Sequence, residues 1–152
     1  MSIELRKILV AIDFGDMTDQ VVTYAADMAK LFSAELVVCY VVDDAGILSR
    51  LPPGGEGYFP PNLAQVQEDY ARNEMARMSA LQSLAQPARL VIGRGKPSDE
   101  ILRIATAEQA DLLIQGTHGR GAIAHAILGS VAERNVRSAP CPVLTVRQQD
   151  RT

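Results

Sequence analysis

The sequence lacks the features that mark several common classes of protein. Among its 152 residues there is no tryptophan, and the only two cysteines, Cys39 and Cys141, each lie inside an apolar run. Such surroundings favour two buried, reduced thiols, although a disulfide or a shared metal ion stays open as an alternative. No apolar run reaches the length of a membrane span, and the first residues lack the basic region and long apolar core of a secretory signal. We therefore expect a cytoplasmic protein without a membrane segment.

An excess of positive charge is also missing. The net charge is −3 at pH 7 and the pI is about 5.3, which argues against a nucleic-acid-binding surface. The same balance means that any anion site must be local, built from backbone N–H groups and one or two arginines. No activated nucleophile, carboxylate pair or metal-ligand cluster stands out, so the sequence does not indicate an efficient enzyme.

Short apolar runs alternate with helical patterns along most of the chain. Runs that are apolar throughout are typical of parallel strands covered on both faces. The sequence predicts five strands, at residues 8–12, 35–42, 88–93, 110–115 and 143–146. It predicts helices at residues 19–32, 62–86, 98–107 and 130–138. Thr18, Asn62 and Ser130 are the predicted N-caps of three of them. This alternation predicts one α/β domain over residues 1–152, a parallel sheet with helices on both faces.

Residues 43–61 interrupt the alternation. They contain four prolines and four glycines, which make regular structure improbable. We expect a Pro/Gly-rich loop within the domain. Tyr58 and Phe59 in this loop could cover a bound base or contact a partner protein, and a disordered loop is an equal alternative.

The stretch DLLIQGTHGRGAIAHAILGSVAE, residues 111–133, combines a strand, a glycine-rich turn and a helix start. Open backbone N–H groups and the dipole of the helix favour an anion there, and a nucleotide phosphate is our prediction. Ser130 and Glu133 have the spacing of a capping box. No Lys-Ser/Thr pair follows the glycines, so the stretch is not a Walker loop. It also follows a late strand, whereas the dinucleotide fingerprint follows the first.

The first strand ends on a carboxylate, Asp13. In open parallel sheets the ligand lies beyond the carboxyl ends of the strands, where the strand order reverses. If the first and fourth strands flank that reversal, Asp13 and Gly116 face each other across the site. Asp13 could instead only cap the turn that follows it.

The glycine stretch, followed by SAPCPVLTV, resembles the universal stress protein (UspA) superfamily through its motif G-x2-G-x9-G-S, which here is Gly116, Gly119, Gly129 and Ser130. The segment KILVAIDFGDMTDQVVTYAADMAK is similar to the first strand and helix of the same family. The resemblance covers nearly the whole chain and is weakest over residues 43–86.

The resemblance implies a Rossmann-like domain of the adenine nucleotide alpha hydrolase-like kind, with strand order 3-2-1-4-5, and a homodimer. It also implies ATP binding, with ADP or AMP as alternatives, because the branch of the family that carries this motif binds ATP. The implied nucleotide-binding residues are Ala11, Asp13, Val41, Gly116, His118, Gly119, Arg120, Gly129, Ser130 and Val131.

The resemblance also implies a role for each part of this set. Asp13 and Val41 would lie at the adenine and ribose, and Gly116 and Gly119 at the ribose and phosphates. Residues 129–131 would offer backbone N–H groups to the phosphates. Arg120 could contact a terminal phosphate or be a solvated loop charge, and His118 is expected to be a positioning residue.

Three positions depart from the family pattern. Many members have proline where Ala11 stands, and some have a hydroxyl where Ala132 stands, so one phosphate hydrogen bond worth ~1–2 kcal/mol is absent. The turn after the first strand has the sequence Asp-Phe-Gly in place of Asp-Gly-Ser.

Three functions compete on this sequence. The first is a homodimeric ATP-binding module that acts in a stress response through an unknown regulatory partner. The second is a slow Mg-dependent ATPase, in which Asp13 would hold the magnesium and Arg120 or His118 would stabilise charge. The third is a dimeric interaction protein without bound nucleotide. In each case we expect a homodimer through the strand at 143–146. This strand is an edge strand next to prolines, and it would pair with the same strand of a second copy.

Overall fold

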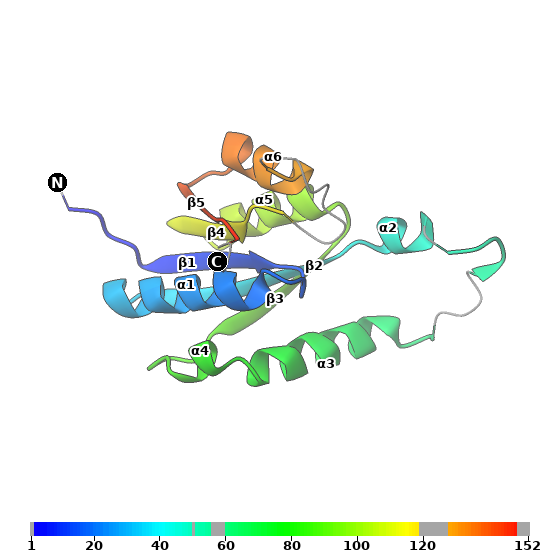
Figure 1. The fold of residues 1–152 in the computed structure, drawn as a ribbon, viewed down its shortest axis with the longest axis horizontal. Helices are drawn as coiled ribbons and strands as arrows, with labels where there is room; N and C mark the ends of the chain where they lie inside the picture. Colours follow the sequence, from blue (N-terminus) through cyan, green and yellow to red (C-terminus); the bar gives the residue numbers. More distant parts are fainter. Residues whose placement is uncertain (1, 50, 56–59, 119–127, 149–152) are drawn as a thin grey trace.

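The computed structural model describes residues 2–49, 51–55, 60–118 and 128–148. They contain a five-stranded parallel sheet in the order β3-β2-β1-β4-β5 (Figure 1). The strands are β1 (Lys7–Ile12), β2 (Glu35–Val42), β3 (Arg89–Arg94), β4 (Leu112–Gly116) and β5 (Val143–Val146). The predicted strands, their parallel direction and their order are confirmed, and β5 is an edge strand as predicted.

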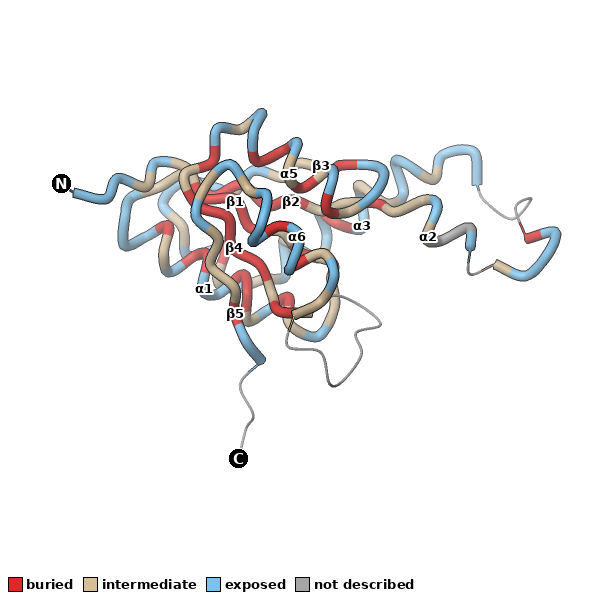
Figure 2. The backbone as a smooth tube through the Cα atoms, turned by 90° about the horizontal axis from the view of Figure 1, so that it is seen from above, coloured by how far each residue is buried: buried red, intermediate tan, exposed pale blue. Residues whose placement is uncertain are grey.

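Helices cover both faces of the sheet because successive strand residues point to opposite sides. In β1, Ile8 and Val10 pack with α1 (Thr18–Phe32), whereas Leu9 packs with α5 (Pro97–Ala107). The helix α6 (Ser130–Ser138) lies beside α5, and the short α4 (Ser79–Gln82) lies beside α1. Figure 2 shows that the buried backbone follows the central strands. The apolar runs therefore form a core in two layers, one on each face.

Both cysteines are free thiols, as predicted. Cys39 is buried in β2, and burial raises the pKa of its thiol to about 12. Cys141 is half-buried next to β5, and burial raises its pKa too. Both thiols therefore stay protonated at neutral pH, which makes them unreactive apolar side chains.

Residues 43–61 are not a loop throughout, which corrects the sequence prediction. Helix α2 occupies Asp44–Ser49, and the Asp43 carboxylate accepts a hydrogen bond from the Gly46 N–H at 2.9 Å. This carboxylate starts the helix, and the four prolines all lie after it, from Pro52 onward. Tyr58 and Phe59 lie outside the described residues.

The helix predicted from Asn62 onward is interrupted. Helix α3 (Leu63–Ala76) ends with Arg77 as its C-cap residue, and α4 begins at Ser79. Val66 and Tyr70 are exposed, and Ala71 is the buried residue of α3. Figures 1 and 2 show the reason: the helices α2 and α3 extend beyond the carboxyl ends of the strands, so most of α3 has no sheet beneath it.

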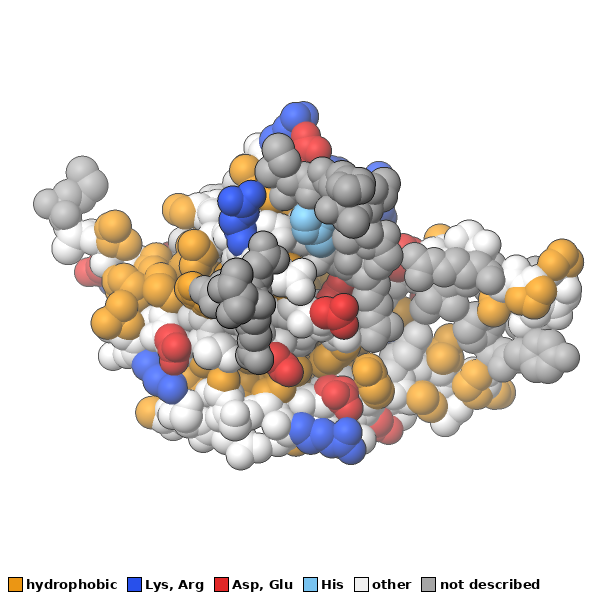
Figure 3. Space-filling view, in the orientation of Figure 1, with side chains coloured by type: hydrophobic (Ala, Val, Ile, Leu, Met, Phe, Trp, Pro, Cys, Tyr) orange, Lys and Arg blue, Asp and Glu red, His pale blue; other side chains and the backbone are white. Residues whose placement is uncertain are grey.

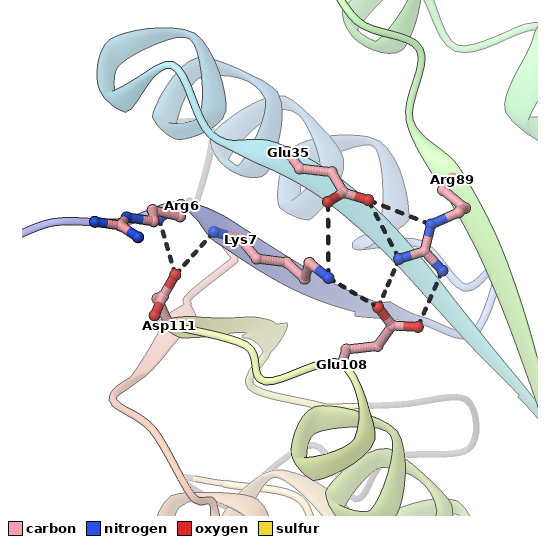
Figure 4. A network of polar contacts seen from close by, with 6 residues as sticks. All are labelled: Arg6, Lys7, Glu35, Arg89, Glu108 and Asp111. Carbon is pink, nitrogen blue, oxygen red and sulfur yellow. Dashed lines mark hydrogen bonds and ion pairs between the residues drawn. The ribbon is translucent and has the colours of Figure 1, made fainter.

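The amino ends of the strands, which we call the amino edge of the sheet, are joined by charged side chains (Figure 4). Lys7 Nζ lies 3.3 Å from Glu108 and 3.7 Å from Glu35, and Arg89 contacts the same two carboxylates. The Asp111 carboxylate accepts hydrogen bonds from the backbone N–H groups of Arg6 and Lys7, at 2.8 and 2.9 Å. We call these side chains the amino-edge network: Lys7, Glu35, Arg89, Glu108 and Asp111. It joins β1, β2 and β3 to the turn before β4.

The network shifts the ionisation of its members. The hydrogen bond with Arg89 holds the pKa of Glu108 below its usual value, and the same bond raises the pKa of Arg89. Both groups are therefore charged over the whole neutral range.

The longest described helix, α1, has 15 residues, and no helix in the described ranges has the length and apolarity of a membrane span.

Candidate functional site

The carboxyl ends of β1 and β4 lie next to each other at the point where the strand order reverses. These strands pair in parallel, with β2 and β3 on one side and β5 on the other. Asp13 follows β1 directly, and Thr117 follows β4. The predicted meeting of Asp13 with the glycine stretch therefore has the topology it requires.

The turn after β1 is held by Asp13 and by aromatic contacts. Asp13 Oδ1 accepts a hydrogen bond from the Gly15 N–H at 2.8 Å, so Asp13 has the turn-capping role that the sequence left open. Phe14 adopts the left-handed conformation, with a φ of 57°. Its ring packs edge-on against Tyr40 at 4.9 Å and Tyr70 at 5.3 Å between centroids. These contacts stabilise a conformation that is costly for a residue other than glycine.

The end of β4 passes close to the first turn of α1. A Cβ atom at Gly116 would lie 3.4 Å from both Met17 Sδ and Val21 Cγ2, which is van der Waals contact with two side chains, so β4 packs closely against the start of α1 here. His118 is half-buried, and its Nδ1 lies 3.2 Å from Thr117 Oγ1. Gly119 and Arg120 lie outside the described residues.

The start of α6 is joined to the end of β4 by a hydrogen bond. The Gly129 N–H donates to the Thr117 carbonyl at 2.7 Å, and the Thr117 N–H donates to the Val146 carbonyl at 3.1 Å. The Gly129 N–H is thus used within the protein. Of the three N–H groups predicted to face phosphate, those of Ser130 and Val131 precede the first hydrogen bond within α6, which Glu133 donates to Gly129.

The predicted capping box does not form. Gly129 is the N-cap residue of α6, no side chain caps this end, and Ser130 is exposed at the first helical position. The Glu133 carboxylate pairs with Arg137 at 2.7 Å instead, one turn further along the helix. The predicted cap of α1 is wrong in the same way, because Met17 is its N-cap residue and Thr18 is buried inside the helix. Asn62 is the N-cap residue of α3, but its side chain makes no capping hydrogen bond.

Three of the predicted site residues share one apolar surface. The side chains of Ala11, Val41 and Val131 are partly buried and pack against the core on the α5–α6 face. Ala11 and Val41 each stand one residue before the end of their strand, β1 and β2, and Val131 lies in the first turn of α6. An apolar floor next to a carboxylate and a helix start is a suitable surface for a base and a phosphate group.

A buried polar chain that the sequence analysis missed lies beneath the start of α6. Ser98 Oγ donates to Asn135 Oδ1 at 2.8 Å, and Asn135 Nδ2 donates to Gln115 Oε1 at 2.9 Å. Gln115 Nε2 donates to the Ala132 carbonyl and to Thr145 Oγ1, at 3.0 and 3.2 Å. The available signal was a glutamine inside the apolar run of β4.

The described residues contain no group of three or more histidine, cysteine or acidic side chains that could hold a metal ion. A magnesium ion near Asp13 would therefore take most of its ligands from phosphates and water, as magnesium commonly does.

Two surface hollows, of about 280 and 360 Å³, lie elsewhere: one is lined by Ile3, Leu5 and Phe32, the other by Met75, Leu81 and Leu90. Figure 3 shows apolar side chains gathered near the N-terminal end of the molecule, where the first hollow lies.

Comparison with known proteins finds the same family over nearly the whole chain. The family model described as "Universal stress protein family" matches residues 4–147. Universal stress protein MJ0531 of Methanocaldococcus jannaschii is 31% identical over 143 residues, which cover 94% of this chain and 82% of that protein.

Solved structures show the same fold. Universal stress protein MJ0577 of M. jannaschii superimposes with a TM-score of 0.79 at 26% identity, covering 96% of this chain and 98% of that one. A universal stress protein solved in complex with cAMP superimposes with a TM-score of 0.67 at 24% identity, covering 95% of this chain and 98% of that one.

Proposed function

The chain belongs to the universal stress protein family, and from this premise we propose that it binds an adenine nucleotide at the carboxyl edge of its sheet. ATP is the proposed ligand, and ADP and AMP are the alternatives. The protein would act in the cytoplasm as a homodimer, and the bound nucleotide would regulate its contact with a partner in a stress response.

One hydrogen bond carries this proposal. The bond from the Gly129 N–H to the Thr117 carbonyl holds the start of α6 at the end of β4, where the strand order reverses. The N–H groups of Ser130 and Val131 lie at this helix start, where no side-chain cap competes for them. The helix dipole adds partial positive charge at the same point, which favours a phosphate.

The rest of the edge supports a base and a ribose. Ala11 and Val41 offer an apolar surface, and the Asp13 carboxylate follows β1 immediately. The solved complex with cAMP supports an adenine nucleotide as the ligand, because cAMP is a cyclic adenine nucleotide and the protein that binds it has the same fold. Gly119 and Arg120 complete the proposed site on the strength of the family motif.

The decisive experiment is to measure what the protein holds and binds. Mass spectrometry of the purified protein, released under denaturing conditions, should detect ATP, ADP or AMP. Titration calorimetry of the emptied protein should show saturable binding of ATP and weaker binding of GTP. A protein that carries no nucleotide and gives no heat with ATP contradicts the proposal and favours an interaction protein with an empty site.

Hydrolysis is a separate question that the same preparation answers. Single-turnover assays with magnesium should compare the wild type with Asp13→Ala. Equal background rates leave binding as the function, whereas a rate that depends on Asp13 favours the slow ATPase.

The homodimer is proposed through β5. This strand lies at the edge of the sheet, and its outer backbone groups can pair with a second copy related by a two-fold axis. Sedimentation equilibrium should give twice the chain mass of 16.4 kDa. A single-chain mass at all concentrations contradicts this part of the proposal.

A further inference from the structure

The buried polar chain beneath α6 connects four elements of the sheet and helix layers. Ser98 belongs to α5, Asn135 to α6 and Gln115 to β4, and the Gln115 amide also reaches Thr145 in β5. Asn135 is 0% exposed and Gln115 is 4% exposed. No buried side-chain nitrogen or oxygen in the described residues lacks a hydrogen-bond partner.

Stability alone is a poor explanation for these buried amides. Burying an amide is unfavourable unless its hydrogen bonds are satisfied, and an apolar pair of the same shape stabilises a core about as well. Hydrogen bonds differ from apolar contacts in that they require direction. A helix can shift on an apolar surface at little cost, whereas a buried amide pair permits one arrangement, as a buried asparagine does in a coiled coil.

The amides hold α6 at two points that lie near the proposed phosphate site. Gln115 bonds to the carbonyl of Ala132 in the first turn of α6 and to the side chain of Asn135 in the next. Contacts on two successive turns fix both the rotation of the helix and its position along its axis. At a rise of about 1.5 Å per residue, Asn135 lies only about 7.5 Å along the axis from Ser130.

The same strand residues lead into the glycine turn. Gln115 precedes Gly116 and Thr117, and the Thr117 carbonyl accepts the hydrogen bond from Gly129. Residues 115–117 therefore hold residues 129–135 at three places. The N–H groups of Ser130 and Val131 lie between the bond at Gly129 and the bond at Ala132.

We propose that Asn135 and Gln115 are positioning residues for the phosphate end of the bound nucleotide. Their buried amide pair fixes the start of α6 against β4, so that the Ser130 and Val131 N–H groups are held in the geometry that binds phosphate before the ligand arrives. This inference rests on the proposed nucleotide function. It concerns phosphate affinity and leaves unaffected the base, which the proposed function places against β1 and β2.

The test compares ligands with and without phosphates. Affinities of Gln115→Leu, Asn135→Leu and the double variant for ATP and for adenosine should be measured by calorimetry, together with thermal unfolding. Each variant should bind ATP at least about tenfold more weakly than the wild type, because pre-organisation of the binding groups is lost. Adenosine affinity should change less than about twofold, because its contacts with β1 and β2 remain.

The double variant separates positioning from stability. It replaces the amide pair by an apolar pair, so its unfolding temperature should recover relative to the single variants while its ATP affinity stays low. Ser98→Ala removes only the hydroxyl that donates to Asn135, and it provides a mild variant that keeps the fold. It should weaken ATP binding in the same direction by a smaller factor. Val136→Ala, at the exposed neighbour of Asn135, is the matched control and should bind both ligands normally.

Three results overturn the inference, and they differ in what they leave standing. Equal weakening of ATP and adenosine, or recovery of ATP affinity in the double variant, shows that the amide pair is structural and leaves the proposed function intact. A wild type that binds neither ligand overturns both the inference and the proposed function.

Discussion

The amino and carboxyl ends of the strands, the amino edge and the carboxyl edge of the sheet, are built from different chemical groups. At the amino edge, side chains of opposite charge contact one another: Lys7 and Arg89 each meet Glu35 and Glu108 (Figure 4). At the carboxyl edge, the turn after β1 is held by the Asp13 carboxylate and the Phe14 ring, and the end of β4 is joined to α6 by a backbone hydrogen bond. The charged groups of the first edge are satisfied by each other, whereas a helix start with no side-chain cap lies at the second.

This difference indicates a division of work. A network of satisfied charges contributes to stability and has little to offer a ligand. Backbone N–H groups at a helix start are positioned by the fold itself, so they can bind an anion without a net positive charge on the protein. The chain carries a net charge of −3, and a backbone site is the kind of anion site that this charge permits. Substitutions at the two edges should therefore affect different measurements.

The largest effect is expected at the carboxyl edge, from Gly129→Val. The backbone of Gly129 is extended, with φ −69° and ψ 162°, so valine fits the conformation, and it adds a branched side chain at the helix start where we propose that phosphate binds. ATP affinity should fall at least about a hundredfold, a loss of roughly 2.7 kcal/mol. Calorimetry measures the affinity, and circular dichroism should show an unchanged fold.

Gly119→Val is expected to abolish binding as well, on the strength of the family motif. Val136→Ala, elsewhere on α6, is the control for a change of side-chain volume. If Gly129→Val binds ATP as the wild type does, the phosphates do not lie at the start of α6.

The next largest effect is expected at the amino edge, from Glu108→Gln. This change removes one of the two carboxylates that Lys7 and Arg89 share, and leaves both cations to Glu35. Because the pair is partly solvated, the free energy of unfolding should fall by about 1–2 kcal/mol, between the values for exposed pairs and for buried charged hydrogen bonds. Urea denaturation measures the loss.

ATP affinity of Glu108→Gln should match the wild type, since the network lies at the far end of the strands. Glu4→Gln is the control, because Glu4 pairs with Arg6 in an exposed position. Its effect on unfolding should be below about 0.5 kcal/mol. A Glu108 variant that loses ATP binding while staying folded would show that the two edges are not independent.

The sequence predicted the sheet almost completely and the site only in part. Five apolar runs with intervening helices permit few arrangements, and the position of the glycine stretch after the fourth strand indicated the edge that carries the candidate site. Local capping signals failed where burial or another contact within the helix took the side chain. Thr18 is buried, and Glu133 pairs with Arg137, so neither forms the cap that its spacing indicated.

Other features could not be predicted because they depend on distant partners. Gln115 and Asn135 are adjacent only after β4 and α6 pack together, and no local pattern links them. Phe14 in the left-handed region is stabilised by Tyr40 and Tyr70, two residues on other elements. The exposed face of α3 follows from the extension of the helices α2 and α3 away from the sheet, which helical periodicity alone does not contain.

The pH dependence of stability should distinguish the amino edge further. The folded pKa of Glu108 lies below its unfolded value of about 4.3, so its stabilising effect is present above that pH and is lost as the pH falls through the folded pKa. The free energy of unfolding should therefore decrease below about pH 4.3. Glu108→Gln should lose less stability over this range, because the network no longer contains this titrating group. Parallel curves for the two proteins would show that other carboxylates account for the decrease.

The smallest effect is expected from Ser130→Ala, and it tests whether side chain or backbone serves the helix start. A capping serine replaced by alanine costs about 1 kcal/mol of stability. Ser130 is at the first helical position and its hydroxyl does not cap α6, so the free energy of unfolding should change by less than about 0.5 kcal/mol. ATP affinity should fall by no more than about threefold, because the backbone N–H remains. If urea denaturation shows that the free energy of unfolding falls by about 1 kcal/mol, the Ser130 hydroxyl does cap α6. The hydroxyl would then compete with phosphate for the same backbone groups.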